Sequence, residues 1–313
     1  MEPVTPSVGW GVLHLYYRVD RERAEREPGA AKRIVDAVAS LEADGHQALC
    51  IAVLGHKADF GVMAFGPDLA NLWHDGGVHR VFRRTEVRIE GAPGGVEIRP
   101  GDDELAGDVR HYLGGPFDLD SFYAFAETEP VLARIVPELR GFRPPLSPDP
   151  YETLVSAITA QQISLKAAFA VRNRFIQAFG AKAGLAYAFP TRERIALAEP
   201  EEILALGFSR RKAEYAIGIA RSDLDLRAIA TLPDDNVKAA LTALPGIGEW
   251  TAEWFLARHL ARPDAWPAGD LGLRKAVLHF YGEEDTRAAG DRFPGFRNLA
   301  AHYLLTGHRV LAG

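Results

Sequence analysis

Apolar residues follow a strand-like pattern in the first quarter of the chain. The stretches GWGVLHLYYRVD (9–20), ALCIAVLG (48–55) and DFGVMAFG (59–66) are short and rich in aliphatic and aromatic residues, which is typical of β-strands. Between the first two, AAKRIVDAVASLEA (30–43) carries apolar residues at helical spacing. The pattern predicts a strand, helix, strand, strand unit over residues 1–72.

The hydrophobic pattern changes after residue 72. The segments HRVFRRTEVRIEG (79–91) and VEIRP (96–100) are short and separated by the turn-forming APGG, so we expect a small antiparallel sheet region over residues 73–115. Almost every later segment is helical, and residues 116–313 are expected to form a helical domain. Breaks rich in proline, glycine and aspartate divide it into about nine or ten helices. The expected fold class is mainly α, with a small N-terminal α+β region.

Composition limits the function classes. The 313 residues are 47% hydrophobic and 25% charged, which suits two or three globular domains. No apolar run approaches the roughly 20 residues of a membrane span, and the opening MEPVTPSVGW lacks the features of a signal peptide, so we expect a cytoplasmic protein without a membrane partner. Cys50 is the only cysteine, which excludes an internal disulfide, an all-cysteine zinc site and a four-cysteine iron–sulfur cluster. The net charge of -6 means that any nucleic acid must be bound by local patches.

The stretch LPGIGEWTAEW (244–254) places a proline and two glycines where a helix is about to begin. Glycine there costs stability unless the backbone has a task. Two interpretations stay open: a simple corner between helices, or a loop whose N–H groups bind an anion at a helix N-terminus. In the second, Gly246, Ile247 and Gly248 would contact a DNA phosphate without reading the base sequence.

The helical segments around this loop follow one another in a particular order. EEILALGFSRRKAEYAIGIAR (201–221) precedes a helix of about ten residues, then LPGIGEWTAEWFLARHL, then PAGDLGLRKAVLHFY. This order resembles the helix-hairpin-helix DNA glycosylases, most closely the AlkA-like 3-methyladenine glycosylases, over about residues 73–313. The resemblance implies a base excision repair enzyme that hydrolyses the N-glycosidic bond of alkylated purines such as 3-methyladenine. It also implies double-stranded DNA as partner, a monomer, and no required cofactor.

Asp270 stands 22 residues beyond Gly248, where GDLGLRKAV begins a helix. By itself it is best explained as a helix N-cap, a role that aspartate favours. The resemblance places the family's catalytic aspartate at this position. There a carboxylate would stabilise positive charge that develops on the sugar, or orient the attacking water. Both roles can hold at once.

The resemblance also implies a pocket for an extruded base. Family members that cut the DNA backbone carry a lysine at the position of Trp250, and tryptophan cannot form a Schiff base, so a monofunctional enzyme is implied. Trp250 and Trp254 lie four residues apart on one helix face, and with Phe293 they would stack on an electron-poor alkylated base. The alternative is that these rings belong to the core.

Two further segments are implied to contact DNA. ITAQQISLKAA (158–168) resembles the segment that fills the gap left by the extruded base, which implicates Gln161 and Gln162. Gln162 occupies the position of a leucine wedge in some members, and an ordinary amphipathic helix start is the alternative. Within GFSRRKAEY a local basic patch is formed by Ser209, Arg210, Arg211 and Lys212. A solvated helix start explains the patch about as well.

Family hairpins also hold a monovalent cation on backbone carbonyls. In this chain the resemblance assigns those carbonyls to Thr242, Leu244 and Ile247. Residue types cannot test the assignment, because every residue carries a backbone carbonyl.

The head of the chain resembles a different family. WGVLHLYYRVD and VLGHKADFGVMAFGPDL, within residues 9–72, resemble the opening of the chlorite dismutase-like heme proteins. The later segment that carries that family's proximal histidine is not found, so His14, His46 and His56 are interpreted as surface or core residues. Two alternative functions remain: a non-catalytic helix-hairpin-helix DNA-binding protein, and a heme-binding protein that acts through the head.

Overall fold

The computed structural model divides the chain into two compact units. One contains Met1–Gly101 and Ile176–Phe189, and the other contains Asp102–Phe175 and Pro190–Gly313. The structure describes residues 10–17, 47–52, 60–67, 69–74, 76–92, 95–163 and 165–311. The helix expected at 30–43, together with His46 and His56, lies outside the described residues.

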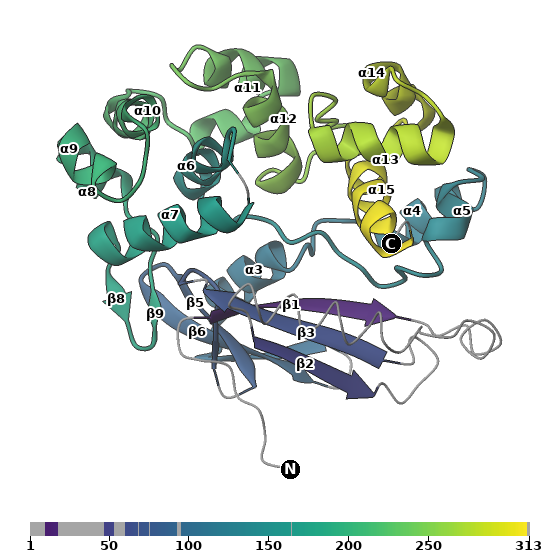
Figure 1. Ribbon diagram of the computed structural model, residues 1–313, viewed down its shortest axis with the longest axis horizontal. Helices are drawn as coiled ribbons and strands as arrows, with labels where there is room; N and C mark the ends of the chain where they lie inside the picture. Colours follow the sequence, from purple (N-terminus) through teal and green to yellow (C-terminus); the bar gives the residue numbers. More distant parts are fainter. Residues whose placement is uncertain are drawn as a thin grey trace. The chain divides into compact units, whose positions relative to one another are not determined.

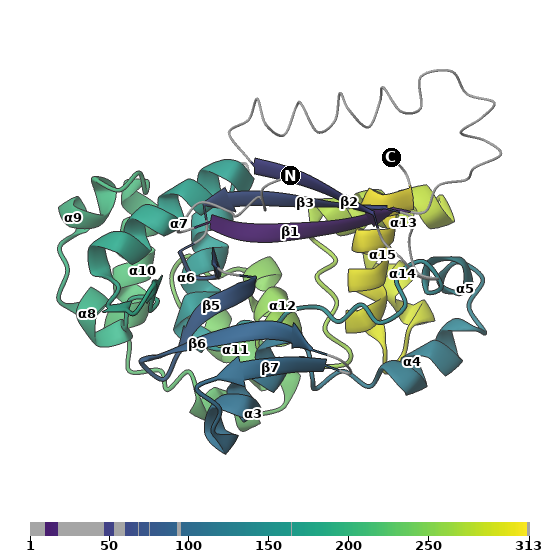
Figure 2. The ribbon, with the colours of Figure 1, turned by 90° about the horizontal axis from the view of Figure 1, so that it is seen from below.

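Three strands of the first unit form an antiparallel sheet. β1 (Trp10–Tyr17) and β2 (Gln47–Ala52) both pair with β3 (Phe60–Pro67), which gives the order β1-β3-β2. Figure 2 shows the three strands side by side. The strands expected from the apolar stretches are confirmed, with ends shifted by up to three residues.

A four-stranded antiparallel sheet completes this unit. It consists of β4 (Leu72–His74), β5 (Gly77–Phe82), β6 (Thr85–Ala92) and β7 (Gly95–Arg99), paired in sequence order. Arg83 and Arg84 both have positive φ at the β5–β6 turn, as a tight two-residue hairpin requires. Because all these strands share one compact unit, the structure does not divide the chain at residue 72.

A short hairpin of β8 (Lys182–Ala183) and β9 (Ala186–Tyr187) belongs to the same unit. The carboxylate of Glu86 accepts hydrogen bonds from the N–H groups of Leu185 and Ala186, at 3.0 and 3.2 Å. One side chain of β6 thereby satisfies two backbone donors of the hairpin.

Helices dominate the second unit, so the expected fold class is confirmed (Figure 1). The long helices are α3 (Asp103–Tyr112), α4 (Leu119–Ala126), α6 (Pro150–Ala160), α7 (Leu165–Phe179), α10 (Arg210–Arg221), α11 (Asp234–Thr242), α12 (Glu249–Arg258), α13 (Leu271–Tyr281) and α15 (Arg297–Leu311). The last turn of α7, from Ile176, is assigned to the first unit. The short helices are α5 (Leu132–Ile135), α8 (Arg192–Ala196), α9 (Pro200–Leu204) and α14 (Thr286–Ala289), with the 3-10 turns η1 (Ala228–Thr231) and η2 (Gly290–Arg292). Helices of four or five residues are too short to show an apolar period, which explains why the sequence predicts fewer. Among the described helices, none is long and apolar enough to cross a membrane.

The core of the helical unit fixes α13 against α15. Phe122 of α4 and Tyr303 of α15 are fully buried, with ring centres 4.8 Å apart. The Tyr303 hydroxyl donates to the carbonyl of Phe142 at 2.9 Å, so this buried polar group is satisfied. Leu273 of α13 belongs to the same cluster. The first turn of α13 is therefore held in place by the core, and Asp270 lies at the N-terminal end of this helix.

Candidate active site

A hairpin of two helices, α11 and α12, carries the glycine-rich turn. Gly246 has φ +86°, and a Cβ there would overlap the Tyr215 ring. Both facts require glycine. Gly248 is the N-cap of α12 and offers no side-chain acceptor. The first N–H groups of α12 have no partner within the helix, and the helix dipole makes this end favourable for an anion.

Side chains from two other helices hold this turn in place. The Gln161 amide, just after α6, donates to the Gly246 carbonyl at 3.2 Å. The Lys212 ammonium of α10 donates to the carbonyls of Thr159 and Gln161 at 3.0 and 2.6 Å. Tyr215 of α10 packs on Gly246. The structure thus joins three of the sequence-predicted DNA-binding residues, Gln161, Lys212 and Gly246, in one network.

The charges of the predicted basic patch are partly engaged. Lys212 is held by the carbonyls that end α6, and burial lowers the pKa of its ammonium group. Arg210 pairs with Glu201 at 3.2 Å, and the Ser209 hydroxyl caps α10 by accepting from the Lys212 N–H at 3.4 Å. Arg211 is exposed. Lys212 therefore stabilises the turn that follows α6 at Gln161.

That turn presents side chains to solvent. Gln162 is exposed and has φ +57°, a conformation that non-glycine residues adopt only infrequently. Ile163, the next residue, is 41% exposed. Either side chain is placed to project from the surface of the unit. The wedge role of Gln162 stays a prediction.

Asp270 is bound through both carboxylate oxygens. Oδ1 accepts from the Leu273 N–H at 2.9 Å, which confirms the predicted N-cap of α13. Oδ2 accepts from the indole N–H groups of Trp250 at 3.1 Å and Trp254 at 3.2 Å. The structure therefore gathers the predicted catalytic carboxylate and the two predicted pocket tryptophans, and it assigns the capping and site roles to different oxygens.

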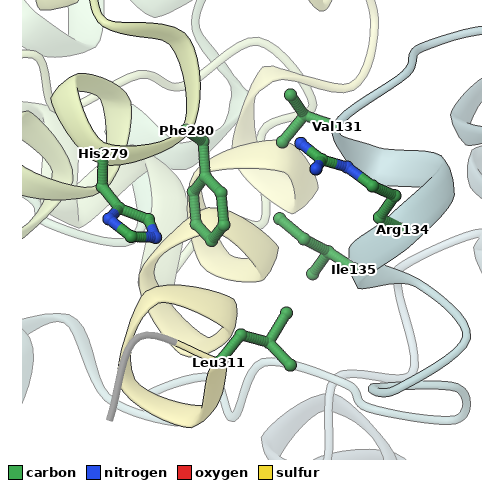
Figure 3. Close-up of a pocket in the computed structure, with 6 residues that line it drawn as sticks. All are labelled: Val131, Arg134, Ile135, His279, Phe280 and Leu311. Carbon is green, nitrogen blue, oxygen red and sulfur yellow. The ribbon is translucent and has the colours of Figure 1, made fainter.

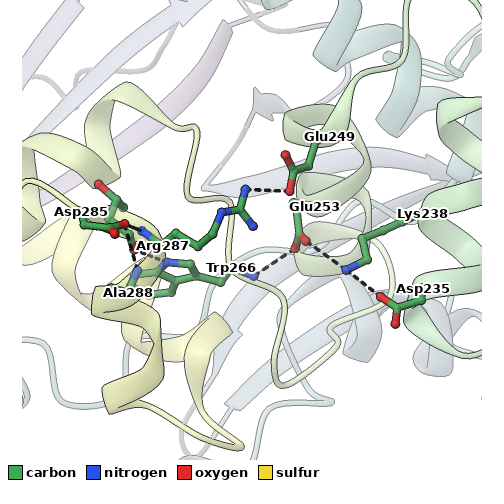
Figure 4. A network of polar contacts seen from close by, with 9 residues as sticks. Asp235, Lys238, Glu249, Glu253, Trp266, Asp285, Arg287 and Ala288 are labelled. Atoms are coloured by element: carbon green, nitrogen blue, oxygen red, sulfur yellow. Dashed lines mark hydrogen bonds and ion pairs between the residues drawn. The ribbon is translucent and has the colours of Figure 1, made fainter.

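The loop that leads to Asp270 is fixed by hydrogen bonds that sequence reasoning did not identify. Glu253 accepts from the backbone N–H of Trp266 at 3.1 Å, and the Trp266 indole donates to the Thr286 carbonyl at 2.7 Å. Figure 4 shows this network, in which Lys238 also faces Glu253 at 3.5 Å. A glutamate on an amphipathic helix gives no sequence signal for such a contact. These hydrogen bonds make the loop that precedes Asp270 rigid.

Asn298 clamps the start of the same loop. It is 1% exposed, and its amide nitrogen donates to the carbonyls of Ala257 and Arg262 at 3.0 and 2.9 Å. Each of these carbonyls lies beyond or near the end of α12, where helical acceptors lack intrahelical donors. Asn298 thus ties α15 to the segment between α12 and α13.

The structure places Phe293 differently from the sequence-based interpretation. Its side chain is fully buried, and the centre of its ring lies 5.6 Å from the ring centre of Trp266 and 6.1 Å from that of Tyr281. No face of the ring is open to a base. Phe293 is a core residue here, because it packs within the buried cluster that also contains Trp266 and Leu273.

Two hollows mark the surroundings of α13. The one beside Trp250, lined also by Glu249, Glu253, Pro267, Ala268, Gly269 and Arg287, measures about 60 Å³. It is smaller than a small-molecule site. The other measures about 350 Å³ and lies beside the C-terminal part of α13 (Figure 3). No sequence-predicted site residue lines it.

The carbonyls assigned to a cation lie in the hairpin turn. The Leu244 carbonyl accepts from the Ile247 N–H at 3.1 Å, and the Thr242 hydroxyl donates to the Lys238 carbonyl at 2.8 Å. A carbonyl oxygen has two lone pairs, so the Leu244 bond leaves one for a cation. The monovalent cation stays a prediction.

Comparisons with known proteins agree with this arrangement. Residues 155–292 match the family model described as HhH-GPD superfamily base excision DNA repair protein. A DNA-3-methyladenine glycosylase of Bacillus subtilis is 33% identical over 193 residues, which are 58% of this chain and 64% of that relative. The chain thus spans somewhat less than two thirds of that protein.

Two solved structures share the fold. The 3-methyladenine DNA-glycosylase of Archaeoglobus fulgidus gives a TM-score of 0.68 at 29% identity, over 77% of this chain and 90% of that one. The DNA-3-methyladenine glycosidase of Bacillus halodurans gives 0.52 at 30% identity, over 60% and 88%. None of these relatives is named as a heme protein, so the resemblance of the head to chlorite dismutase-like proteins is not supported. The chain has the α11–α12 hairpin, the Asp270 carboxylate and these similarities to known proteins. It therefore belongs to the HhH-GPD superfamily of base excision DNA repair proteins.

Proposed function

We propose that the protein is a monofunctional DNA glycosylase that hydrolyses the N-glycosidic bond of alkylated purines, such as 3-methyladenine, in double-stranded DNA. The names of its relatives support this substrate class. The observation that carries the proposal is the Asp270 carboxylate, held by the indole N–H groups of Trp250 and Trp254. A carboxylate with only a capping role has no need of two aromatic donors on its second oxygen.

Asp270 acts on charge that appears during bond cleavage. As the bond between C1′ and the base nitrogen breaks, its electron pair leaves with the base and the sugar becomes positively charged. The carboxylate stabilises that charge and orients the water that attacks C1′, and one water proton is released as the new C–O bond forms. Because the charge is largest in the transition state, the interaction accelerates the reaction instead of only binding DNA.

Trp250 and Trp254 supply the surface for the extruded base. Their indole rings are electron-rich, and an alkylated purine is electron-poor, so stacking is favourable. The hollow of about 60 Å³ beside Trp250 must widen to admit the base.

DNA is held by backbone groups and the exposed turn. The backbone of Gly246, Ile247 and Gly248 approaches a phosphate, to which the N–H groups of Gly246 and Gly248 donate, and Gln162 fills the space that the extruded base leaves. Trp250 offers no amine for a Schiff base, so the product is an unbroken abasic strand. The enzyme acts as a monomer, and hydrolysis requires no cofactor. The carbonyls of Thr242, Leu244 and Ile247 are proposed to hold a monovalent cation at the hairpin.

Release of damaged bases tests the proposal directly. DNA treated with a methylating agent is incubated with the protein, and the released bases are identified by chromatography. Release of 3-methyladenine by the wild-type protein and its loss in Asp270→Asn are expected. DNA binding without release of any base would instead identify a non-catalytic helix-hairpin-helix protein.

A further inference from the structure

Trp254 is covered on one side by a positive charge. The guanidinium carbon of Arg258, one turn further along α12, lies 5.7 Å from the centre of the Trp254 ring. Among the described residues, no carboxylate lies within 4.0 Å of this guanidinium. Arg258 is near enough to Asp270 to feel its charge. An unpaired cation therefore stands against a ring that is already hydrogen-bonded to the proposed catalytic carboxylate.

The neighbours of Arg258 on α15 add positive charge, so Asp270 is the acid that acts on this guanidinium. Arg309 of α15 is close enough to repel Arg258. His302, also on α15, lies edge-on to Trp254 with ring centres 5.5 Å apart and is 6% exposed. Burial, reinforced by Arg258 and Arg309, lowers the pKa of His302 well below its usual value. The histidine is thus neutral, and the two arginines set the positive potential around Trp254.

A base that stacks on the face of Trp254 opposite Arg258 would feel this potential. Many alkylated purines, including 3-methyladenine and 7-methylguanine in DNA, carry a formal positive charge, whereas a deaminated purine such as hypoxanthine is neutral. Asp270 attracts the charged bases, and Arg258 opposes that attraction from the other side of the ring. We propose that Arg258 is a specificity-determining residue that disfavours cationic bases relative to neutral ones. This inference rests on the proposed glycosylase function.

The size of the effect follows from the separation of charges. A base stacked about 3.5 Å from the ring would stand about 9 Å from the Arg258 guanidinium, given its 5.7 Å distance to the ring centre. At the effective dielectric constant of a protein surface, with screening by physiological salt, repulsion over this distance corresponds to roughly a three- to tenfold change in relative rate. The repulsion acts on the cationic base alone.

The experiment compares two lesions in one duplex sequence. Single-turnover rates of base release are measured for 7-methylguanine and for hypoxanthine, and the ratio of the two rates is reported. Arg258→Gln removes the charge and keeps a long polar side chain, whereas Arg258→Lys keeps the charge. Arg227→Gln is the matched control, because Arg227 is exposed in the same unit and is close to Asp149 and Asp225. A loss of folding or of general DNA affinity lowers both rates and leaves their ratio unchanged.

We expect the ratio of 7-methylguanine to hypoxanthine release to rise about three- to tenfold in Arg258→Gln. The ratio should stay near the wild-type value in Arg258→Lys and Arg227→Gln, and the difference should shrink at high salt. An unchanged ratio in Arg258→Gln, with both bases still released, overturns the role of Arg258 and leaves the glycosylase function standing. Failure of the wild-type protein to release any base from methylated or hypoxanthine-containing DNA overturns both.

Discussion

Replacing Asp270 by asparagine separates its two roles, because each carboxylate oxygen has its own partners. Oδ1 accepts from the Leu273 N–H, and Oδ2 accepts from the two indole N–H groups. Asparagine has one oxygen and one NH₂ group. If its oxygen keeps the cap, the NH₂ group faces two indole donors. If it turns over, the NH₂ group faces the Leu273 N–H and the cap is lost.

The magnitude follows from these two arrangements. A lost cap costs about 1 kcal/mol, and a partly buried donor left without an acceptor costs about 1–3 kcal/mol. We therefore expect Asp270→Asn to lower the free energy of unfolding by about 1–3 kcal/mol. For a unit of this size the Tm falls by about 2–4 °C for each kcal/mol. Because stabilities of about 5–15 kcal/mol are usual, the variant remains folded.

Base excision responds much more strongly than stability. The carboxylate meets a positive charge that exists mainly in the transition state, so its loss should slow single-turnover release of 3-methyladenine about 10²–10³-fold. Affinity for a duplex with an abasic site should change little, since backbone N–H groups supply those contacts. Near-wild-type excision by folded Asp270→Asn would refute the catalytic role.

A double-mutant cycle with Trp254→Phe isolates the indole bond. Phenylalanine keeps an aromatic ring and removes the donor, so it relieves part of the conflict in Asp270→Asn. The two substitutions should couple by about 0.5–3 kcal/mol in chemical denaturation. Strict additivity would show that the bond from Trp254 Nε1 to Asp270 contributes nothing to stability.

Three further outcomes are expected. Gly246→Ala should lower stability by about 1–3 kcal/mol and weaken DNA binding, because its Cβ would overlap Tyr215 at φ +86°. Gly218→Ala, with open space around the Cβ in α10, should be neutral or stabilising. Equal effects of the two substitutions in thermal melts and DNA titrations would contradict this prediction. Borohydride should trap no covalent protein–DNA adduct, since Trp250 replaces the amine of a lyase, and an adduct on a denaturing gel would disprove this. Burial lowers the pKa of His259 to about 4. Below pH 6.5 the histidine of the unfolded chain therefore binds a proton that the folded protein does not, and the free energy of unfolding should fall by roughly 2–3 kcal/mol from pH 6.5 to pH 4. His259→Gln should flatten that fall in denaturation curves measured against pH.

Local features of the fold and of the site could be predicted from the sequence. The strands of β1, β2 and β3 follow from short apolar stretches, and α12 and α13 follow from helical spacing with glycine or aspartate at the start. These features depend on residues within about four positions of one another. The N-cap role of Asp270 is such a feature, and the structure confirms it.

Other features depend on the path of the chain. Phe293 could face a pocket or the core, and only the folded RFPGF turn places it fully inside. The basic residues of GFSRRKAEY could all reach DNA, yet Lys212 is bound by carbonyls of α6. A side chain's partners come from distant segments, and the sequence pattern of one segment carries no information about which segment will lie opposite.

The sequence by itself determined the order of helices, the glycine-rich turn, and the aspartate that begins α13, because helical periodicity, backbone freedom and capping are local properties of the chain. Only the tertiary structure decided that Trp250 and Trp254 donate to one oxygen of Asp270, that Tyr215 closes over Gly246, and that Arg258 stands against Trp254. The Asp270 contacts join residues 16 and 20 positions apart. Such contacts exist because helix packing in the core brings the ends of α12 and α13 together, which no local pattern specifies.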